Sequence, residues 1–209
     1  MTAIESALRG AQRAFNASGG HTRDALGEPV VENMLVAYGF VATLAEQGVD
    51  PLSMGHARHL LELNALVLCG TDPERRARYA DHLAATERRF YEEPGAGVGD
   101  LVETMALNAG DDAFERAAAA YMRMLGRPQL FIEGNHRTGA LVIASVLLLA
   151  ARPPFVLTAS NADAYFTASS AFRNLEKNGL GALLRAAGLR RDFARMLRAE
   201  VRPEYLHHA

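Results

Sequence analysis

Apolar side chains recur every three or four positions along most of the chain, the spacing of helices buried on one face. The segment from Glu28 to Gly48 shows this pattern clearly, with a proline in its first turn and a glycine just past its end. A second helix is predicted to end near Gly70. Alternating runs long enough for a sheet are absent from the sequence. The pattern therefore predicts an all-α fold.

One segment, Thr138–Ala151, is apolar on nearly every side, and two prolines follow it closely. A helix without a polar face is typical of the centre of a bundle. Its longest apolar run, Gly139 to Ala151, is too short to span a bilayer. We therefore expect a buried central helix and no membrane association.

Glycines and a proline interrupt the chain between Glu92 and Asp100. The region between about Thr86 and Gly97 is the one place where strands are expected, as a short β-hairpin. The whole chain, residues 1–209, is predicted to form a single domain. Its expected parts are an N-terminal helical part at 1–55, a core at 56–180 and a C-terminal helix at 181–209.

Composition and charge fit this prediction. The chain has 209 residues, of which 49% are hydrophobic and 22% charged, and its net charge of −2 does not favour binding to nucleic acid. A single cysteine rules out an internal disulfide, and the first residues lack the pattern of a signal peptide. We expect a cytoplasmic protein, and the sequence leaves its oligomeric state open.

The candidate chemistry lies directly before the apolar helix, in a short polar loop. Backbone N–H groups in the first turn of a helix have no partners inside that helix, and they give its end a partial positive charge. Glycine allows a close backbone approach, and the guanidinium group of arginine matches phosphate oxygens. The predicted phosphate-binding residues are Gly134, Asn135, His136, Arg137 and Thr138.

A carboxylate beside the loop would complete a phosphate site, but the same residues also allow a simpler interpretation. Glu133 precedes the loop glycine, and its carboxylate is placed to hold a Mg²⁺ ion that bridges two phosphates. The alternative is a capped buried helix whose arginine pairs with a nearby carboxylate. Spacing alone leaves both interpretations open.

At these residues the sequence resembles the Fic/Doc family. The family signature reads His-Pro-Phe-x-(Asp/Glu)-Gly-Asn-Gly-Arg, and the stretch here is Gln-Leu-Phe-Ile-Glu-Gly-Asn-His-Arg over residues 129–137. Phenylalanine, acid, glycine, asparagine and arginine fall in register. The resemblance extends over roughly Leu60 to Leu175, with a helix before the motif and an apolar helix after it.

The resemblance implies a compact Fic-like helical bundle with a short β-hairpin flap. It also implies transfer of AMP, or another phosphate-containing group, from a nucleotide such as ATP to a hydroxyl of a protein target. The motif loop would hold the phosphates, and Glu133 would hold Mg²⁺. The flap, with Arg88, Arg89 and Phe90, would align the target.

The chain departs from the family at three positions. Gln129 replaces the motif histidine, and an amide cannot act as the general base near neutral pH. His136 stands where the family has glycine or lysine, which makes it a candidate for a relocated base. Ala140 replaces the second arginine found in many members.

These departures leave two functions open. The first is a divergent transferase, an AMPylator-like nucleotidyltransferase in which His136, or the substrate itself, supplies the base. The second is a catalytically degenerate regulatory or binding module that keeps the phosphate loop. Gln129 and Ala140 favour the module, whereas Glu133, Asn135 and Arg137 together favour phosphate chemistry.

Overall fold

The computed structural model describes residues 2–17, 27–94, 97–175 and 180–208, and helices joined by loops make up these residues. The described residues contain no strand, and the expected all-α class is confirmed. The helices are α1 (Thr2–Ala17), α2 (Glu28–Glu46), α3 (Arg58–Cys69), α4 (Pro73–Arg78), α5 (Ala80–Glu92), α6 (Val98–Leu107), α7 (Ala113–Leu125), α8 (Asn135–Leu149), α9 (Ala162–Arg173), α10 (Leu180–Glu200) and the 3₁₀ helix η1 (Pro203–His208).

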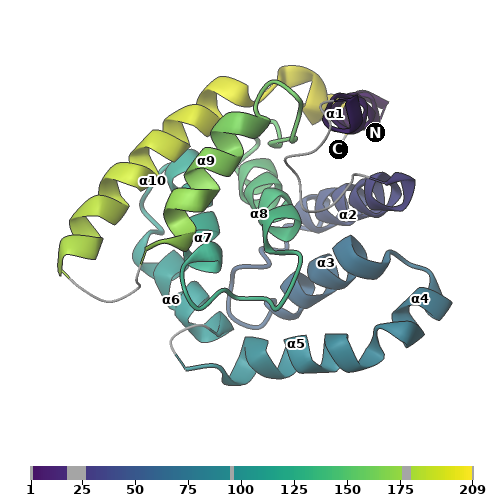
Figure 1. The fold of residues 1–209 in the computed structure, drawn as a ribbon. Coiled ribbons are helices and arrows are strands. Elements are labelled where there is room, and N and C mark those ends of the chain that lie inside the picture. Colours follow the sequence, from purple (N-terminus) through teal and green to yellow (C-terminus); the bar gives the residue numbers. More distant parts are fainter. Residues whose placement is uncertain (1, 18–26, 95–96, 176–179, 209) are drawn as a thin grey trace.

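Helix α8 occupies the centre of the molecule, with α2 and α3 on one side and α7 and α9 on the other (Figure 1). It packs against α7, α2 and α3, and its side chains are buried around the whole circumference. This is the burial that its apolar sequence predicts. None of the described helices is both long enough and apolar enough to cross a membrane.

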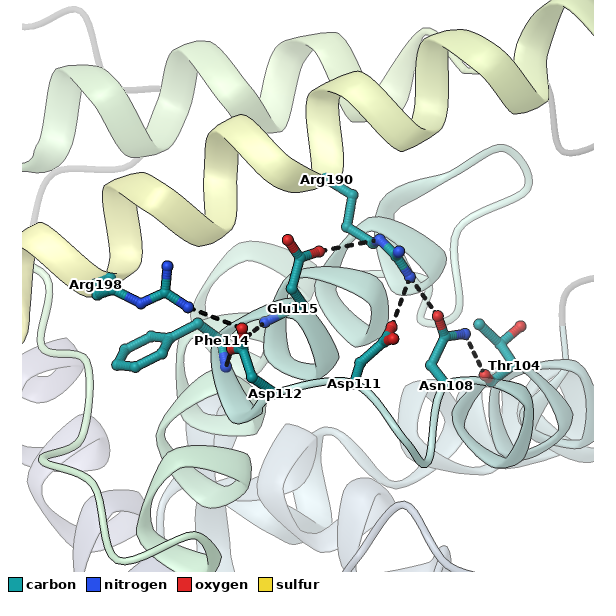
Figure 2. A network of polar contacts seen from close by, with 8 residues as sticks. All are labelled: Thr104, Asn108, Asp111, Asp112, Phe114, Glu115, Arg190 and Arg198. Atoms are coloured by element: carbon teal, nitrogen blue, oxygen red, sulfur yellow. Dashed lines mark hydrogen bonds and ion pairs between the residues drawn. The ribbon is translucent and has the colours of Figure 1, made fainter.

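Helix α10 is attached to the start of α7 by charged contacts, which Figure 2 shows from close by. The guanidinium group of Arg190 donates to Asp111 Oδ2 at 3.0 Å and lies 3.2 Å from a carboxylate oxygen of Glu115. About two turns further along α10, Arg198 donates to Asp112 Oδ2 at 2.8 Å. The arginines of the C-terminal helix therefore do not all face solvent.

An aromatic cluster also joins α7, α9 and α10. The ring of Tyr121 stacks on Tyr165 with centroids 5.1 Å apart and on Phe193 with centroids 5.3 Å apart. All three side chains are buried, as is Phe172, whose ring meets Tyr121 edge-on. The cluster lies against the first turn of α8 because Tyr121 and Tyr165 both contact His136.

The predicted β-hairpin between Thr86 and Gly97 is wrong. Helix α5 runs from Ala80 to Glu92, and the next helix begins at Val98, with positions 95 and 96 outside the described residues. Thr86 and Phe90, four residues apart, are the buried side chains of α5 and lie on one face of it. Helical periodicity thus continues through the segment, and burial of this face favours the helix over a hairpin.

Candidate functional site

The polar loop before α8 is held in shape by Asn135. Its side chain accepts a hydrogen bond from the backbone N–H of Phe131 at 3.0 Å and donates to the carbonyl of the same residue at 2.8 Å. Gly134 adopts a left-handed conformation with φ of 76°. The chain therefore turns sharply into the helix, a conformation for which glycine is favoured.

A buried asparagine on α3 fixes the loop from the other side. Asn64 donates to the carbonyl of Glu133 at 2.9 Å and to the hydroxyl of Thr138 at 3.0 Å. A Cβ atom at Gly134 would lie 2.9 Å from the Asn64 amide nitrogen. The fully buried hydroxyl of Thr138 thus helps to hold the loop by accepting this hydrogen bond from Asn64.

The N-terminus of α8 has no side-chain cap. The backbone N–H of Thr138 donates to Gly134, but the N–H groups of Asn135, His136 and Arg137 have no acceptor among the residues that the structure describes. Unpaired N–H groups at a helix start attract anions. The loop therefore keeps the feature on which the phosphate interpretation depends.

Arg137 lines a cavity of about 240 Å³ together with two other arginines. Arg75 and Arg78 come from α4, and the adjacent Tyr79 adds an aromatic ring. Arg137 is oriented by a hydrogen bond of 3.2 Å from Nη1 to the carbonyl of Val67, and no carboxylate pairs with it in the described part of the chain. The alternative of a locally paired arginine is thus not what the geometry shows. We call this space the Arg137 cavity.

Glu133 has the exposure and freedom that a metal ligand needs. Its side chain is 54% exposed, and its Oε2 lies 3.9 Å from Nε2 of His82 on α5. No group of three or more potential metal-binding side chains lies together in the described residues. A single carboxylate nevertheless fits Mg²⁺, which usually takes one or two carboxylates and completes its shell with phosphates and water.

The expected flap residues lie on α5 and still reach the motif. Arg89 donates from Nε and Nη2 to the backbone carbonyl of Gln129, at 3.1 and 2.8 Å. Phe90 is buried and stacks on Phe131 with ring centroids 5.8 Å apart. Arg88 is exposed. The helix therefore supports the motif loop, but with helical rather than hairpin geometry.

His136 is turned into the protein, and a chain of hydrogen bonds determines its tautomer. The Ser169 hydroxyl donates to the carbonyl of Tyr165 at 2.7 Å, so its oxygen must accept from the Tyr121 hydroxyl, 2.6 Å away. The Tyr121 oxygen is then left to accept from His136 Nδ1 at 3.1 Å. In the neutral ring, the proton therefore resides on Nδ1 and the lone pair on Nε2.

The surroundings also favour the neutral form of His136. Burial lowers the pKa of His136, and the positive charge of Arg173 lowers it further. Burial raises the pKa of the Tyr121 hydroxyl above its usual range, so Tyr121 remains a neutral hydrogen-bond partner. Nε2, which has no hydrogen-bond partner among the described residues, is the ring nitrogen that can accept a proton.

The other two departures from the Fic signature lie in different surroundings. Gln129 is partly buried, and its side-chain oxygen accepts from Asn135 at 3.4 Å. Ala140 is buried in the core, with 2% exposure. Neither position supplies a titratable group to the loop.

Several residues of the site are not part of the motif. Asn64, Arg75, Arg78 and Arg173 come from helices α3, α4 and α9. Only Asn64 has a signal in the sequence, since it is a polar residue inside the apolar run LLELNALVL. The arginines belong to charged segments in which nothing distinguishes them from solvent-exposed residues.

No protein-family model and no curated protein matches the chain. The likeness to the Fic family rests on the motif residues and on the helices around them. Five of the signature residues are present and in register, at Phe131, Glu133, Gly134, Asn135 and Arg137.

Proposed function

We propose that this protein is a Fic-like helical bundle that binds a nucleotide, such as ATP, or another phosphate-containing ligand at Gly134–Thr138. The observation that carries the proposal is the uncapped start of α8 beside the Arg137 cavity. Three backbone N–H groups at the helix start are without an acceptor among the described residues, and Arg137 of the same turn shares the cavity with two other guanidinium groups and no carboxylate in its lining. Both kinds of group bind phosphate oxygens.

The proposed ligand arrives with Mg²⁺, and Glu133 is the residue that would hold it. Bound Mg²⁺ neutralises phosphate charge and orients the group to be transferred. Glu133 is exposed and directly precedes Gly134, so its carboxylate is available to an ion beside phosphates on the loop. Arg137 orients the phosphates from the opposite end of the same turn.

In the transferase form of the proposal, His136 accepts the proton from a hydroxyl of a protein target. In the neutral ring, the hydrogen-bond chain through Tyr121 and Ser169 leaves Nε2 unprotonated, and burial favours this neutral form. Gln129 cannot take this role but can donate a hydrogen bond from its amide. The hydroxyl oxygen would form a bond to the α-phosphorus as the bond to the rest of the nucleotide breaks, so the products would be a protein carrying AMP and, for ATP, pyrophosphate.

A binding module is the second candidate, and the immediate surroundings of Gln129 favour it. The Gln129 carbonyl is held by Arg89, and its side chain is joined to Asn135, so the position is used to build the loop. General-base catalysis typically contributes on the order of 10²–10⁴ in rate. Without it at position 129, ligand-dependent regulation of a partner needs only the phosphate site.

Ligand binding is tested by calorimetry of the full chain with each nucleoside triphosphate and Mg²⁺. We expect one triphosphate to bind, and Arg137→Ala to weaken that binding by about 10-fold or more, because a charge-assisted contact is lost. Arg191→Ala, an exposed residue of α10, is the matched control and should bind as the wild type does. Unchanged affinity in Arg137→Ala would refute the loop assignment.

Transfer is tested by the mass increase of the protein itself and of cell-lysate proteins incubated with the bound nucleotide. Activity that His136→Asn abolishes, without loss of nucleotide affinity, would identify the transferase with a relocated base. Binding without any mass change would identify the module. If AMP transfer appears only in Gln129→His, the wild-type site is complete except for its base.

A further inference from the structure

A second and larger cavity, of about 560 Å³, lies beside the motif loop. Gln129, Phe131 and Ile132 of the loop form one part of its wall. The other part is formed by Arg89 of α5, Arg127 before the loop and Arg173 at the end of α9. We call it the arginine cavity. Its lining contains three guanidinium groups, one amide and no carboxylate.

The three arginines come from distant parts of the sequence, so their meeting is a product of the fold. Like charges brought together repel one another unless a counter-ion offsets them. Among the described residues, no carboxylate lies within ion-pair distance of Arg89, Arg127 or Arg173. Arginines elsewhere in the molecule, such as Arg76 and Arg190, do pair with carboxylates. The arginine cavity thus has an unbalanced positive charge.

The geometry of the cavity is partly fixed before any ligand binds. Arg89 uses Nε and Nη2 on the carbonyl of Gln129, which holds its guanidinium group in one orientation. The Gln129 side-chain oxygen accepts from Asn135, which leaves the amide nitrogen available as a donor. Arg127 and Arg173 are exposed at the rim. The donors therefore surround a space that is open to solvent.

We propose that the arginine cavity binds a phosphate ester of small-molecule size, as a second ligand beside the one on the α8 loop. Guanidinium groups form paired hydrogen bonds with phosphate oxygens, and a multiply charged anion is needed to balance three of them. The volume lies within the range of roughly 300–1,000 Å³ that is typical of small-molecule sites. The half-exposed Ile132 offers apolar surface to the organic part of the ester.

This site is distinct from the loop site because the two share no lining residue. The Arg137 cavity is lined from α2, α3, α4, Tyr79 and Arg137 of α8, whereas the arginine cavity is lined from α5, α9 and residues 127–132. A nucleotide on the loop and a phosphate ester in the arginine cavity would lie on either side of the same short segment. The inference does not depend on the proposed function, and the two can fail separately.

Inorganic pyrophosphate is the probe that tests the proposal, because it presents phosphate groups to both sites without a base or sugar. Calorimetry of the full chain should give two pyrophosphates per wild-type chain. Arg127→Ala/Arg173→Ala should lose one of them, with its affinity reduced by about 10-fold or more, and Arg137→Ala should lose the other. Arg191→Ala/Arg202→Ala removes the same charge from exposed positions outside both sites and should still bind two.

Each alternative result decides between the sites. A stoichiometry of one that Arg137→Ala abolishes and Arg127→Ala/Arg173→Ala leaves intact would overturn the arginine cavity and support the proposed function. The converse result would support the arginine cavity and refute the loop site. Equal losses in the arginine double variant and in its charge-matched control would show non-specific attraction and overturn the proposal. Far-UV circular dichroism confirms that each variant is folded.

Discussion

The position of Gly134 imposes two requirements that only glycine meets without strain. Its φ is positive, and a Cβ atom would lie 2.9 Å from the Asn64 amide nitrogen. We expect Gly134→Ala to lower the free energy of unfolding by about 1–3 kcal/mol, as strained left-handed residues do. Chemical denaturation measures the change. Gly99→Ala, at an exposed helical glycine with open space around it, should instead leave stability unchanged or raise it by up to about 1 kcal/mol.

His136 should make the stability of the protein depend on pH. Burial lowers its pKa in the folded state below the value of about 6.5 expected in the unfolded chain. Between those two values the unfolded state binds more protons, so the free energy of unfolding falls as the pH decreases through that window. His136→Asn keeps a hydrogen-bond donor for Tyr121 but cannot titrate there.

Urea midpoints at pH 7.5 and 5.5 check this expectation. The wild type should lose more stability than His136→Asn between the two pH values. His59, whose pKa burial also lowers, is present in both proteins and cancels in the comparison. Identical losses would show that His136 titrates alike in the folded and unfolded chains.

At the residue scale, the sequence identified the loop but not its supports. Gly134, Asn135 and Arg137 are recognisable because their chemistry is unusual and their spacing is local. The partners that fix them, such as Asn64 and Arg89, lie 69 and 40 residues away from the atoms they contact. Contacts of that separation depend on how helices pack, which local periodicity does not determine.

Among the elements, α10 has a specific attachment that can be removed by one substitution. Arg190 contacts Asp111, Glu115 and the side chain of Asn108 (Figure 2). Truncation to alanine leaves two partly buried carboxylates without their cation. We expect Arg190→Ala to lower the free energy of unfolding by about 1–3 kcal/mol, measured by thermal or urea denaturation.

Arg191 is the natural control for this change. It is the next residue of α10 and is exposed, so Arg191→Ala removes the same charge without disturbing the attachment. Its effect should be within about 0.5 kcal/mol of zero. Equal effects at the two positions would mean that net charge, rather than the contacts of Arg190, determines the stability.

The positions of the helices could be predicted where one apolar face recurs along the sequence. The boundaries of α2 and the end of α3 follow the proline and glycine signals, whereas α3 begins at Arg58 without such a signal and α8 begins at Asn135, three residues before the apolar run. The loop residues complete its first turn because their backbone groups, not their side chains, continue the helix. The hairpin was mispredicted because the buried face of α5 has only Thr86 and Phe90, and the charged residues around them leave no clear apolar pattern in the sequence.

For the whole molecule, one hydrophobic core extends from α1 to the 3₁₀ helix at the C-terminus. It includes Ile4, the residues of α8 and Tyr205. We expect one cooperative urea transition, in which far-UV circular dichroism and tyrosine fluorescence give the same midpoint. The chain has no tryptophan, and four of its six tyrosines are buried in this core. Two separate midpoints would contradict the prediction of a single domain.

The brace between Asn135 and Phe131 has a consequence for the speed of ligand binding. Both backbone groups of Phe131 are occupied by one side chain, so the turn already has its final shape in the free protein. A ligand then meets a rigid template and need not wait for a loop to close. Association should be governed by diffusion and by attraction to the arginines, and it should slow as salt concentration rises.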